Sequence, residues 1–371
     1  MIRVRSKLIS LLYGRQRVLS TYRFRVVALC ITLFAFLQRL LRRFSSVSPA
    51  FQLSLPPPET PKKYLYVQVS HGLGNRLRAY ASAAALAKKC GRKLGLVWIP
   101  DIHLNATFHE LFDNAVHVLS ESFLDSAYSS PDFVVYDYIT HPVDWRKRQP
   151  VLDKKYANKH IYVYTAYSVV GTTKTQLSDF SRELQLLKPS MGVDFHIRRF
   201  EKTLRSQLGI SLHDLVGVHI RMQSDLSKDI PGIERVNPSD PAALTNRMLA
   251  TAQVRKSCHF SYFIDFIRQE VVRDKSQLFY IASDSMMAIK SLRSAINANN
   301  IITMNETMQS MCFSEHGRAR GCMEFALAEL YVLFRSKELV LSLESSYSEV
   351  AQKYSPHKRV RIGCAVNTLF A

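Results

Sequence analysis

Residues 70–101 read SHGLGNRLRAYASAAALAKKCGRKLGLVWIPD. The apolar runs at 63–70 and 93–99, before and after the alanine-rich stretch, predict two strands, and residues 75–90 predict a helix closed by Gly91. A strand, a glycine turn, a helix and a second strand are typical of a parallel sheet. The turn itself has two interpretations: it holds a phosphate, or it only lets the helix pack closely on the sheet.

Short apolar runs and helical patterns alternate from this stretch to the C-terminus. Further strands are predicted at 132–139, 160–170, 215–222, 277–283 and 337–343, and further helices at 176–187, 191–208, 261–274, 284–296, 322–336 and 345–355. Two successive series predict an α/β fold of two Rossmann-like domains that face a cleft, an N-terminal domain at 64–208 and a C-terminal domain at 209–371. Because open parallel sheets bind ligands at the carboxyl ends of their strands, the residues just after each strand carry the functional information.

The charge is distributed unevenly along the chain. The net charge is +20, and ten Arg or Lys but no Asp or Glu precede Glu59. The remaining residues carry 40 basic and 30 acidic side chains. This excess predicts an anionic partner such as a nucleotide, a nucleic acid or a membrane surface. No basic stripe with interleaved aromatic residues occurs, so we do not expect nucleic acid to be a partner.

The N-terminal segment has the composition of a membrane anchor. We expect a basic cytosolic tail at 1–23, a signal-anchor helix at 24–41 and a Ser/Pro-rich stem at 42–63. The apolar part is short against the about 20 residues of a comfortable span, and a transit peptide or a surface helix are the alternatives. The interpretation predicts a single-pass type II protein of the Golgi membrane, or else of the endoplasmic reticulum, with a lumenal domain.

Two further features fit a lumenal domain. Asn105 and Asn305 begin glycosylation sequons. Cys312 and Cys322 are near enough in sequence to form a disulfide.

Gly72 and Gly74 of the turn HGLGNR let the backbone approach a ligand closely. The turn lacks the third glycine of a dinucleotide fingerprint and the Gly-Lys-Ser/Thr of a P-loop. From these residues alone, phosphate binding and plain packing are equally supported.

The strand GVHIRM carries the second candidate group. His219 and Arg221 point to the same side at its carboxyl end. The forked, always charged guanidinium of Arg221 suits a diphosphate, whereas the structural alternatives are a buried histidine and an ion pair from Arg221 to an acid such as Glu324. Asp225 and Asp229 follow in the loop as candidate catalytic bases.

Polar residues also follow two later strands. Asp284 either caps the next helix or accepts hydrogen bonds from the base or ribose of a nucleotide. Ser345, Ser346 and Ser348 either cap the last helix or bind phosphate with their hydroxyls and the helix amides.

In their order along the chain, the segments GLGNRLRAYASAAALAKKCGRKLGLVWIPD, FHELFD, GVHIRM, FYIASD and SSYSEVA resemble fucosyltransferases of the α1,6- and protein O-fucosyltransferase superfamily. The resemblance covers most of residues 64–355. It implies a GT-B fold and an inverting, metal-independent transfer of fucose from GDP-fucose to a glycan or protein, with no cofactor. The absence of any Asp-x-Asp in the chain agrees with a reaction without metal.

The resemblance also implies roles for single residues. Arg221 would contact the diphosphate beside His219, while Asp284, Ser346 and Ser348 would hold the nucleotide. The chain departs from the α1,6 enzymes at Met222, where they carry a second arginine. This departure and the unassigned base leave a second hypothesis open, a pseudoenzyme that binds a glycan or nucleotide without turnover.

Across the expected cleft from GVHIRM, the turn would form one wall of the sugar-nucleotide site. The residues expected in this wall are His71, Gly72, Gly74, Asn75 and Arg76.

Overall fold

The computed structural model describes residues 63–140, 156–171, 176–222, 257–312 and 318–364. The predicted tail, signal anchor and stem lie outside the described residues except for residue 63, and so do Asp225 and Asp229. Among the helices of the described ranges, none combines the length and the apolar character of a transmembrane span.

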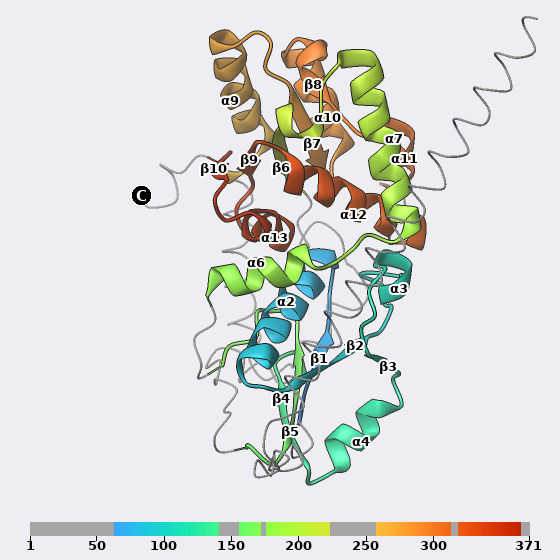
Figure 1. Ribbon diagram of the computed structural model, residues 1–371. Coiled ribbons are helices and arrows are strands. Elements are labelled where there is room, and N and C mark those ends of the chain that lie inside the picture. The colour runs from blue at the N-terminus through green and yellow to red at the C-terminus, as the bar shows by residue number, and fades with distance from the viewer. Residues whose placement is uncertain (1–62, 141–155, 172–175, 223–256, 313–317, 365–371) are drawn as a thin grey trace, which may run out of the picture. The chain divides into compact units, whose positions relative to one another are not determined.

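The first half of the described chain forms one parallel sheet of five strands (Figure 1). Its spatial order is β3-β2-β1-β5-β4. The strands are β1 (Tyr64–Val69), β2 (Lys93–Trp98), β3 (Val118–Leu119), β4 (Phe133–Asp137) and β5 (His160–Thr165). Helix α2 (Leu73–Lys89) connects β1 to β2, and the short helices α3 (Phe108–Leu111) and α4 (Phe123–Ser129) follow. The order of connection reverses between β1 and β5, so this sheet has its switch point there.

The second half repeats this architecture with the order β10-β9-β6-β7-β8. The strands are β6 (Val216–Ile220), β7 (Phe279–Ser283), β8 (Ile301–Ile302), β9 (Glu338–Leu341) and β10 (Arg359–Ile362). In chain order this is the 3-2-1-4-5 arrangement of a dinucleotide-binding half, and its switch point lies between β6 and β9. The connecting helices are α9 (Phe260–Arg273), α10 (Met286–Ala295), α11 (Glu306–Cys312), α12 (Arg320–Arg335) and α13 (Ser346–Tyr354). Short 3₁₀ turns occur at Leu212–Asp214 and Ala298–Asn300.

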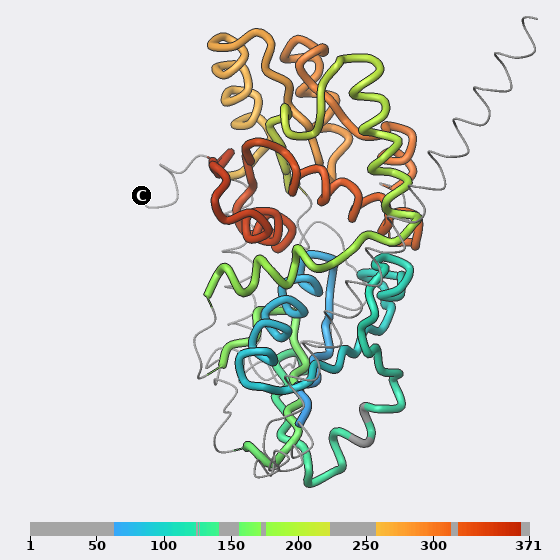
Figure 2. The backbone as a smooth tube through the Cα atoms, in the orientation of Figure 1, coloured from blue at the N-terminus to red at the C-terminus, as the bar shows by residue number. Residues whose placement is uncertain are grey.

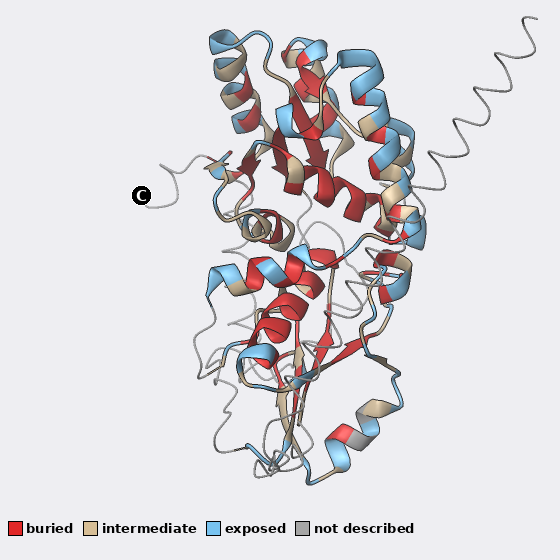
Figure 3. Ribbon diagram, in the orientation of Figure 1, coloured by how far each residue is buried: buried red, intermediate tan, exposed pale blue. Residues whose placement is uncertain are grey.

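Helices α6 (Leu177–Gln185) and α7 (Met191–Leu208) join the two sheets along the chain (Figure 2). Although α7 falls in the range predicted for the N-terminal domain, it packs on α12 of the second half. The boundary at 208/209 stays a prediction. Across the two halves, α2 packs against α6 and α13, and the Tyr331 hydroxyl of α12 donates to the Leu187 carbonyl oxygen at 2.6 Å. One cluster of buried apolar side chains contains residues of both sheets. Helices α2 and α12 are buried along much of their length (Figure 3).

The strands and helices predicted from apolar periodicity are present, with differences of a few residues at their ends. The strand predicted at 160–170 is too long, because β5 ends at Thr165, whose Oγ1 accepts from the Tyr167 amide at 2.9 Å and turns the chain. Gly91 (φ 65°) ends its helix, as predicted, and Gly209 (φ 68°) ends α7; both adopt the left-handed conformation. The prediction omitted α3, α4, α11, β3, β8 and β10, which are too short to show a clear period.

Two disulfides fasten the second half. Cys312 at the end of α11 is bonded to Cys322 in α12, the pair that the sequence analysis had named. A second disulfide joins Cys258, just before α9, to Cys364, just after β10. Because these two residues are 106 positions apart, sequence spacing gave no reason to pair them.

A substitution at Gly74 can test the contact between α2 and α13. A Cβ on Gly74 would lie 2.6 Å from the Ser346 carbonyl carbon and the Tyr347 nitrogen, both backbone atoms, whereas a Cβ on Gly72 would meet nothing within 4 Å. Gly72 has φ −68° and ψ 171°, which alanine adopts freely. We expect Gly74→Ala to lower the free energy of unfolding by about 1–3 kcal/mol, because backbone must move. Gly72→Ala should leave it unchanged or raise it by less than about 1 kcal/mol.

The free energies of unfolding of the two variants are measured by urea denaturation and compared. Equal stability of Gly74→Ala and Gly72→Ala would mean that the two helices do not approach each other this closely.

Candidate active site at the two switch points

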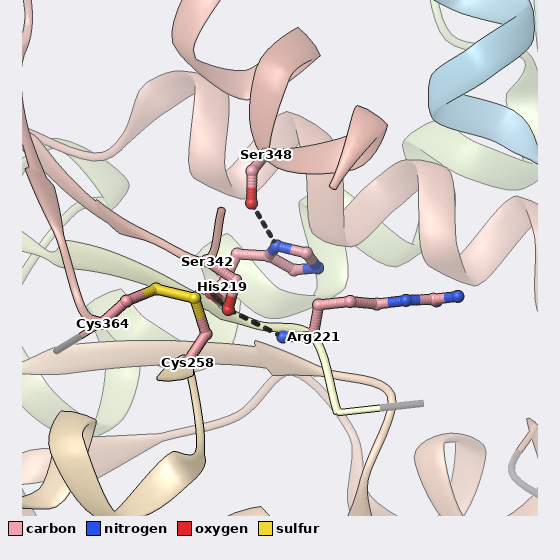
Figure 4. Close-up of a disulfide and its surroundings, with 6 residues drawn as sticks. All are labelled: His219, Arg221, Cys258, Ser342, Ser348 and Cys364. Carbon is pink, nitrogen blue, oxygen red and sulfur yellow. Dashed lines mark hydrogen bonds between the residues drawn. A yellow bond between two sulfur atoms is a disulfide. The ribbon is translucent and has the colours of Figure 1, made fainter. Parts of the chain in front are cut away.

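His219 lies on β6, at the switch point of the second sheet. Its Nδ1 atom is 2.7 Å from Oγ of Ser348 in α13 (Figure 4). Its ring stacks on Tyr347 with 4.7 Å between centroids. Only 5% of His219 is exposed, and this burial lowers its pKa to about 4. The imidazole is therefore neutral at pH 7 and fixes the start of α13 against the end of β6.

Arg221 follows β6 directly and is paired with Asp284. Its Nη1 atom lies 2.9 Å from Oδ2 of Asp284, and Oδ1 of Asp284 accepts from the Met222 amide at 2.7 Å. The ion pair that the sequence allowed to Glu324 is thus formed with Asp284, while Glu324 pairs with Arg320 at 2.9 Å. Asp284 does not cap α10, since that cap is Ser285. Asp284 instead fixes the direction of a guanidinium that is 23% exposed.

The backbone beneath Arg221 is held by Ser342, which follows β9. Its hydroxyl oxygen accepts from the Arg221 amide at 3.0 Å, and the hydroxyl donates to the His219 carbonyl oxygen at 3.2 Å (Figure 4). The strand ends on both sides of the switch point are thereby locked together. The sequence analysis missed Ser342 because it placed this residue inside the strand predicted at 337–343, whereas β9 ends at Leu341.

Helix α13 begins at the same switch point. Ser345 is its N-cap and accepts from the Ser348 amide at 3.4 Å, which matches the capping interpretation. The Ser348 hydroxyl is engaged by His219, and Ser346 is half-buried with no side-chain hydrogen bond inside the described part of the chain. Amides at the start of a helix favour an anion. Arg221 follows β6, whose His219 contacts Ser348 in the first turn of α13.

The turn between β1 and α2 of the first sheet also lies at the start of α13. Gly72 is the N-cap of α2, and Gly74 touches the backbone of Ser346 and Tyr347. Asn75 is half-buried, and its amide makes no hydrogen bond to any of the residues that the structure describes. Arg78, also in α2, forms an ion pair with Glu349 of α13 at 2.7 Å. The starts of α2 and α13 therefore meet, and with them the predicted residues of both halves.

Arg76 is directed inward. It is 0% exposed, its Nε donates to the His71 carbonyl oxygen at 2.8 Å, and its Nη1 donates to the Ile99 carbonyl oxygen at 2.7 Å. Its Nη2 lies 2.8 Å from Oδ2 of Asp101, as an ion pair without hydrogen-bond geometry. In this arrangement the guanidinium supports the turn, and its Nε and Nη1 groups donate to backbone carbonyl oxygens.

His71 lies two residues after β1, at the first switch point. Its Nδ1 lies 3.0 Å from Oγ of Ser70, and its ring is stacked on His103 with 5.4 Å between centroids. Burial and then the nearby His103 lower the pKa of His71 to about 4. Asp101 and His103 were missed by the sequence analysis, although they follow β2 closely.

The predicted glycosylation residues lie on or near the surface. Asn105 is exposed, and Asn305 is half-buried with its Oδ1 accepting from the Met308 amide at 3.0 Å. No group of three or more His, Cys, Asp or Glu side chains suited to a metal ion occurs within the described ranges.

Comparisons with known proteins give structural likeness only. No protein-family model matches the chain, and no curated protein is similar in sequence. The chain is similar to the NodZ alpha-1,6-fucosyltransferase co-crystallised with GDP, with 14% identity, 79% of this chain and 92% of that chain covered, and a TM-score of 0.46. It is also similar to POFUT1 in complex with GDP-fucose, with 12% identity, coverage of 82% and 98%, and a TM-score of 0.46.

A variant of FUT1 from Arabidopsis thaliana in complex with GDP is a third similar structure, with 16% identity, coverage of 83% and 71%, and a TM-score of 0.47. NodZ is a fucosyltransferase, the family that the sequence motifs resemble. At these scores the likeness carries no inference about the activity of this chain, so the proposal below depends on its own residues.

The lowered pKa values of His219 and His71 predict that the protein loses stability in acid. Their pKa falls from 6.5 to about 4 on folding, so the unfolded chain binds protons first as the pH drops. The contribution of these two histidines to the free energy of unfolding is fully present above pH 6.5. It is lost as the pH falls toward 4, at a rate approaching about 1.4 kcal/mol per pH unit for each histidine. We expect the unfolding free energy of His219→Gln, measured in urea between pH 7.5 and 4.5, to fall less steeply.

The unaltered protein and His219→Gln share all other histidines. The difference between their curves of unfolding free energy against pH therefore reports on His219 alone. Parallel curves would mean that His219 is not buried as a neutral ring.

Proposed function

We propose that this protein is an inverting glycosyltransferase that transfers fucose from GDP-fucose to a hydroxyl group of a glycan or protein, without a metal ion. The observation that carries the proposal is the junction of Arg221 and the start of α13 at the switch point between β6 and β9. A switch point at the carboxyl ends of parallel strands is where such sheets bind nucleotides. The order of the motifs along the chain supports GDP-fucose as the donor.

Arg221 has the geometry to support a departing diphosphate. A guanidinium presents several N–H donors in a planar fork, so that a diphosphate can share it with Asp284. As the bond between C1 of the sugar and the diphosphate breaks, negative charge grows on the phosphate oxygens. The fixed charge of Arg221 and the amides of α13 would stabilise that charge more strongly than the ground state.

The remaining polar groups divide between positioning and binding. Asp284 and Ser342 would hold Arg221 in place through its guanidinium and its backbone amide. Asn75 and Ser346 have side chains available for the sugar or the nucleotide. The GT-B arrangement with a cleft, the division at 208/209, the anchor at 24–41 and the Golgi location belong to the same proposal.

Arg221→Ala is the decisive variant. We expect GDP release from GDP-fucose to fall about 100-fold or more, because the leaving charge loses its fixed partner. GDP affinity, measured by calorimetry, should weaken about 10- to 100-fold. The control is Arg335→Ala, which breaks a comparable ion pair, 2.8 Å from Arg335 to Glu201, remote from β6 in sequence, and should leave both quantities unchanged.

Two outcomes would contradict the proposal. Near-normal GDP release by a folded Arg221→Ala protein would place the diphosphate elsewhere. GDP binding by the unaltered protein without any release of GDP from GDP-fucose would favour the pseudoenzyme.

A chelator tests the absence of a metal. Since Arg221 and helix amides would carry the leaving charge, we expect GDP release to be the same within about twofold with and without EDTA. A loss of activity that added Mg²⁺ or Mn²⁺ restores would show that a divalent cation takes part.

A further inference from the structure

His71 is held in a backbone conformation that its residue type rarely adopts. Its φ is 67°, and within the described ranges Glu344 (φ 50°) is the only other non-glycine residue with positive φ. Each of the two precedes the N-cap of a helix that starts at a switch point, α2 or α13. The Arg76 side chain fixes the turn by donating to the His71 carbonyl oxygen at 2.8 Å. Strain of this kind is retained where the surroundings impose it, frequently at active sites.

The hydrogen bonds of His71 determine which ring nitrogen is basic. Nδ1 lies 3.0 Å from Oγ of Ser70, and the Ser70 hydroxyl is in turn hydrogen-bonded to Tyr164, lowering the pKa of that phenol against the larger effect of burial. If the Ser70 hydroxyl donates to Tyr164, its oxygen accepts from Nδ1–H of His71. Nε2 is then the acceptor nitrogen, and it has no hydrogen bond within the part of the chain that the structure describes.

Several charged or titratable groups face the ring. His103 stacks on it with an interplanar angle of 4°, Asp101 attracts a proton to it, and Arg76 and Arg78 of α2 repel one. Burial and His103 outweigh Asp101 and leave the imidazole neutral at pH 7, because they lower its pKa to about 4. A neutral imidazole with a free acceptor nitrogen can take up a proton. Once it is charged, Asp101 stabilises it.

His71 lies close to the part of the second half where the nucleotide sugar is proposed to bind. Gly74, three residues on, touches the backbone of Ser346 and Tyr347, and Tyr347 stacks on His219. Apart from its chain neighbours, a Cβ on Gly72 would meet no atom of the described residues within 4 Å. This open space at the turn is where we place the acceptor, next to His71 and close to the start of α13.

We propose, on the basis of the function proposed above, that His71 is the general base of the transfer. Its Nε2 takes the proton of the acceptor hydroxyl while that oxygen bonds to C1 of the fucose. The bond between C1 and the diphosphate oxygen breaks, and its electron pair leaves with GDP. The proton on His71 then passes to solvent, so that GDP-fucose and a hydroxyl yield a fucoside, GDP and one proton.

His71→Asn is the first test, since asparagine tolerates positive φ better than most residues. Water serves as the acceptor, and GDP release from GDP-fucose is measured. We expect a loss of about 100-fold, the low end for a general base, since the pKa of His71 is well below neutral. GDP affinity by calorimetry should stay within about twofold, because the base does not touch the nucleotide.

Sodium azide separates the base from the diphosphate site. Azide attacks C1 without losing a proton, so it needs no base and yields fucosyl azide and GDP. We expect azide to restore GDP release in His71→Asn and to leave Arg221→Ala inactive, because that variant lacks support for the leaving group. Recovery with azide also demonstrates that His71→Asn is folded.

His103→Asn supplies a readout that a purely structural residue would not change. Removing the stacked imidazole removes a group that lowers the pKa of His71. The acid limb of the kcat/KM profile should therefore move to higher pH, with activity at pH 7.5 retained.

Three results would overturn the inference, and they are distinguishable from failure of the proposed function. The first is GDP release by His71→Asn at the normal rate. The second is azide rescue in Asp225→Asn, Asp229→Asn or Glu344→Gln in place of His71→Asn. The third is an unchanged acid limb in His103→Asn. In each of these cases the transferase itself would stand. If the unaltered protein neither bound GDP nor released it from GDP-fucose, the proposed function would be wrong, and so would the role of His71 as its general base.

Discussion

The close approach of α2 and α13 is the constraint on which the candidate site depends. The two helices belong to different sheets, and their first turns meet where Gly74 has no side chain. The ion pair of Arg78 with Glu349 reinforces this contact one turn further along. Because each helix starts at the switch point of its own sheet, one backbone contact brings the carboxyl ends of both sheets to the same place.

Around this junction, side chains that support the site are distinct from those that could react. Arg76, Asp284, Ser342 and Ser348 are engaged with protein groups and hold strand ends, a guanidinium and an imidazole in place. Such engagement limits the motion of Arg221, which is the requirement for electrostatic stabilisation of a leaving group. Most polar groups of this candidate site serve the geometry of a few, as electrostatic preorganisation requires.

The sequence located the candidate residues better than it assigned their contacts. His219, Arg221, Asp284 and Ser348 were found because each follows or ends a predicted strand, and parallel strands bring such residues to one edge. The sequence did not reveal that Asp284 pairs with Arg221, or that Ser348 engages His219 from a position 129 residues away. Pairing of this kind depends on the spatial order of strands, which local patterns do not contain.

By itself, the sequence determined the α/β class, most strands and helices, the glycine ends of α2 and α7, and the residues at the strand ends, because periodicity and residue type act locally. Only the tertiary structure decided the three roles of the turn at 71–76. There Gly74 admits the backbone of another helix, Arg76 is buried as a support, and His71 is held at a positive φ. The physical reason is that each of these outcomes depends on neighbours from distant parts of the chain, namely α13, the loop after β2 and Tyr164 of β5.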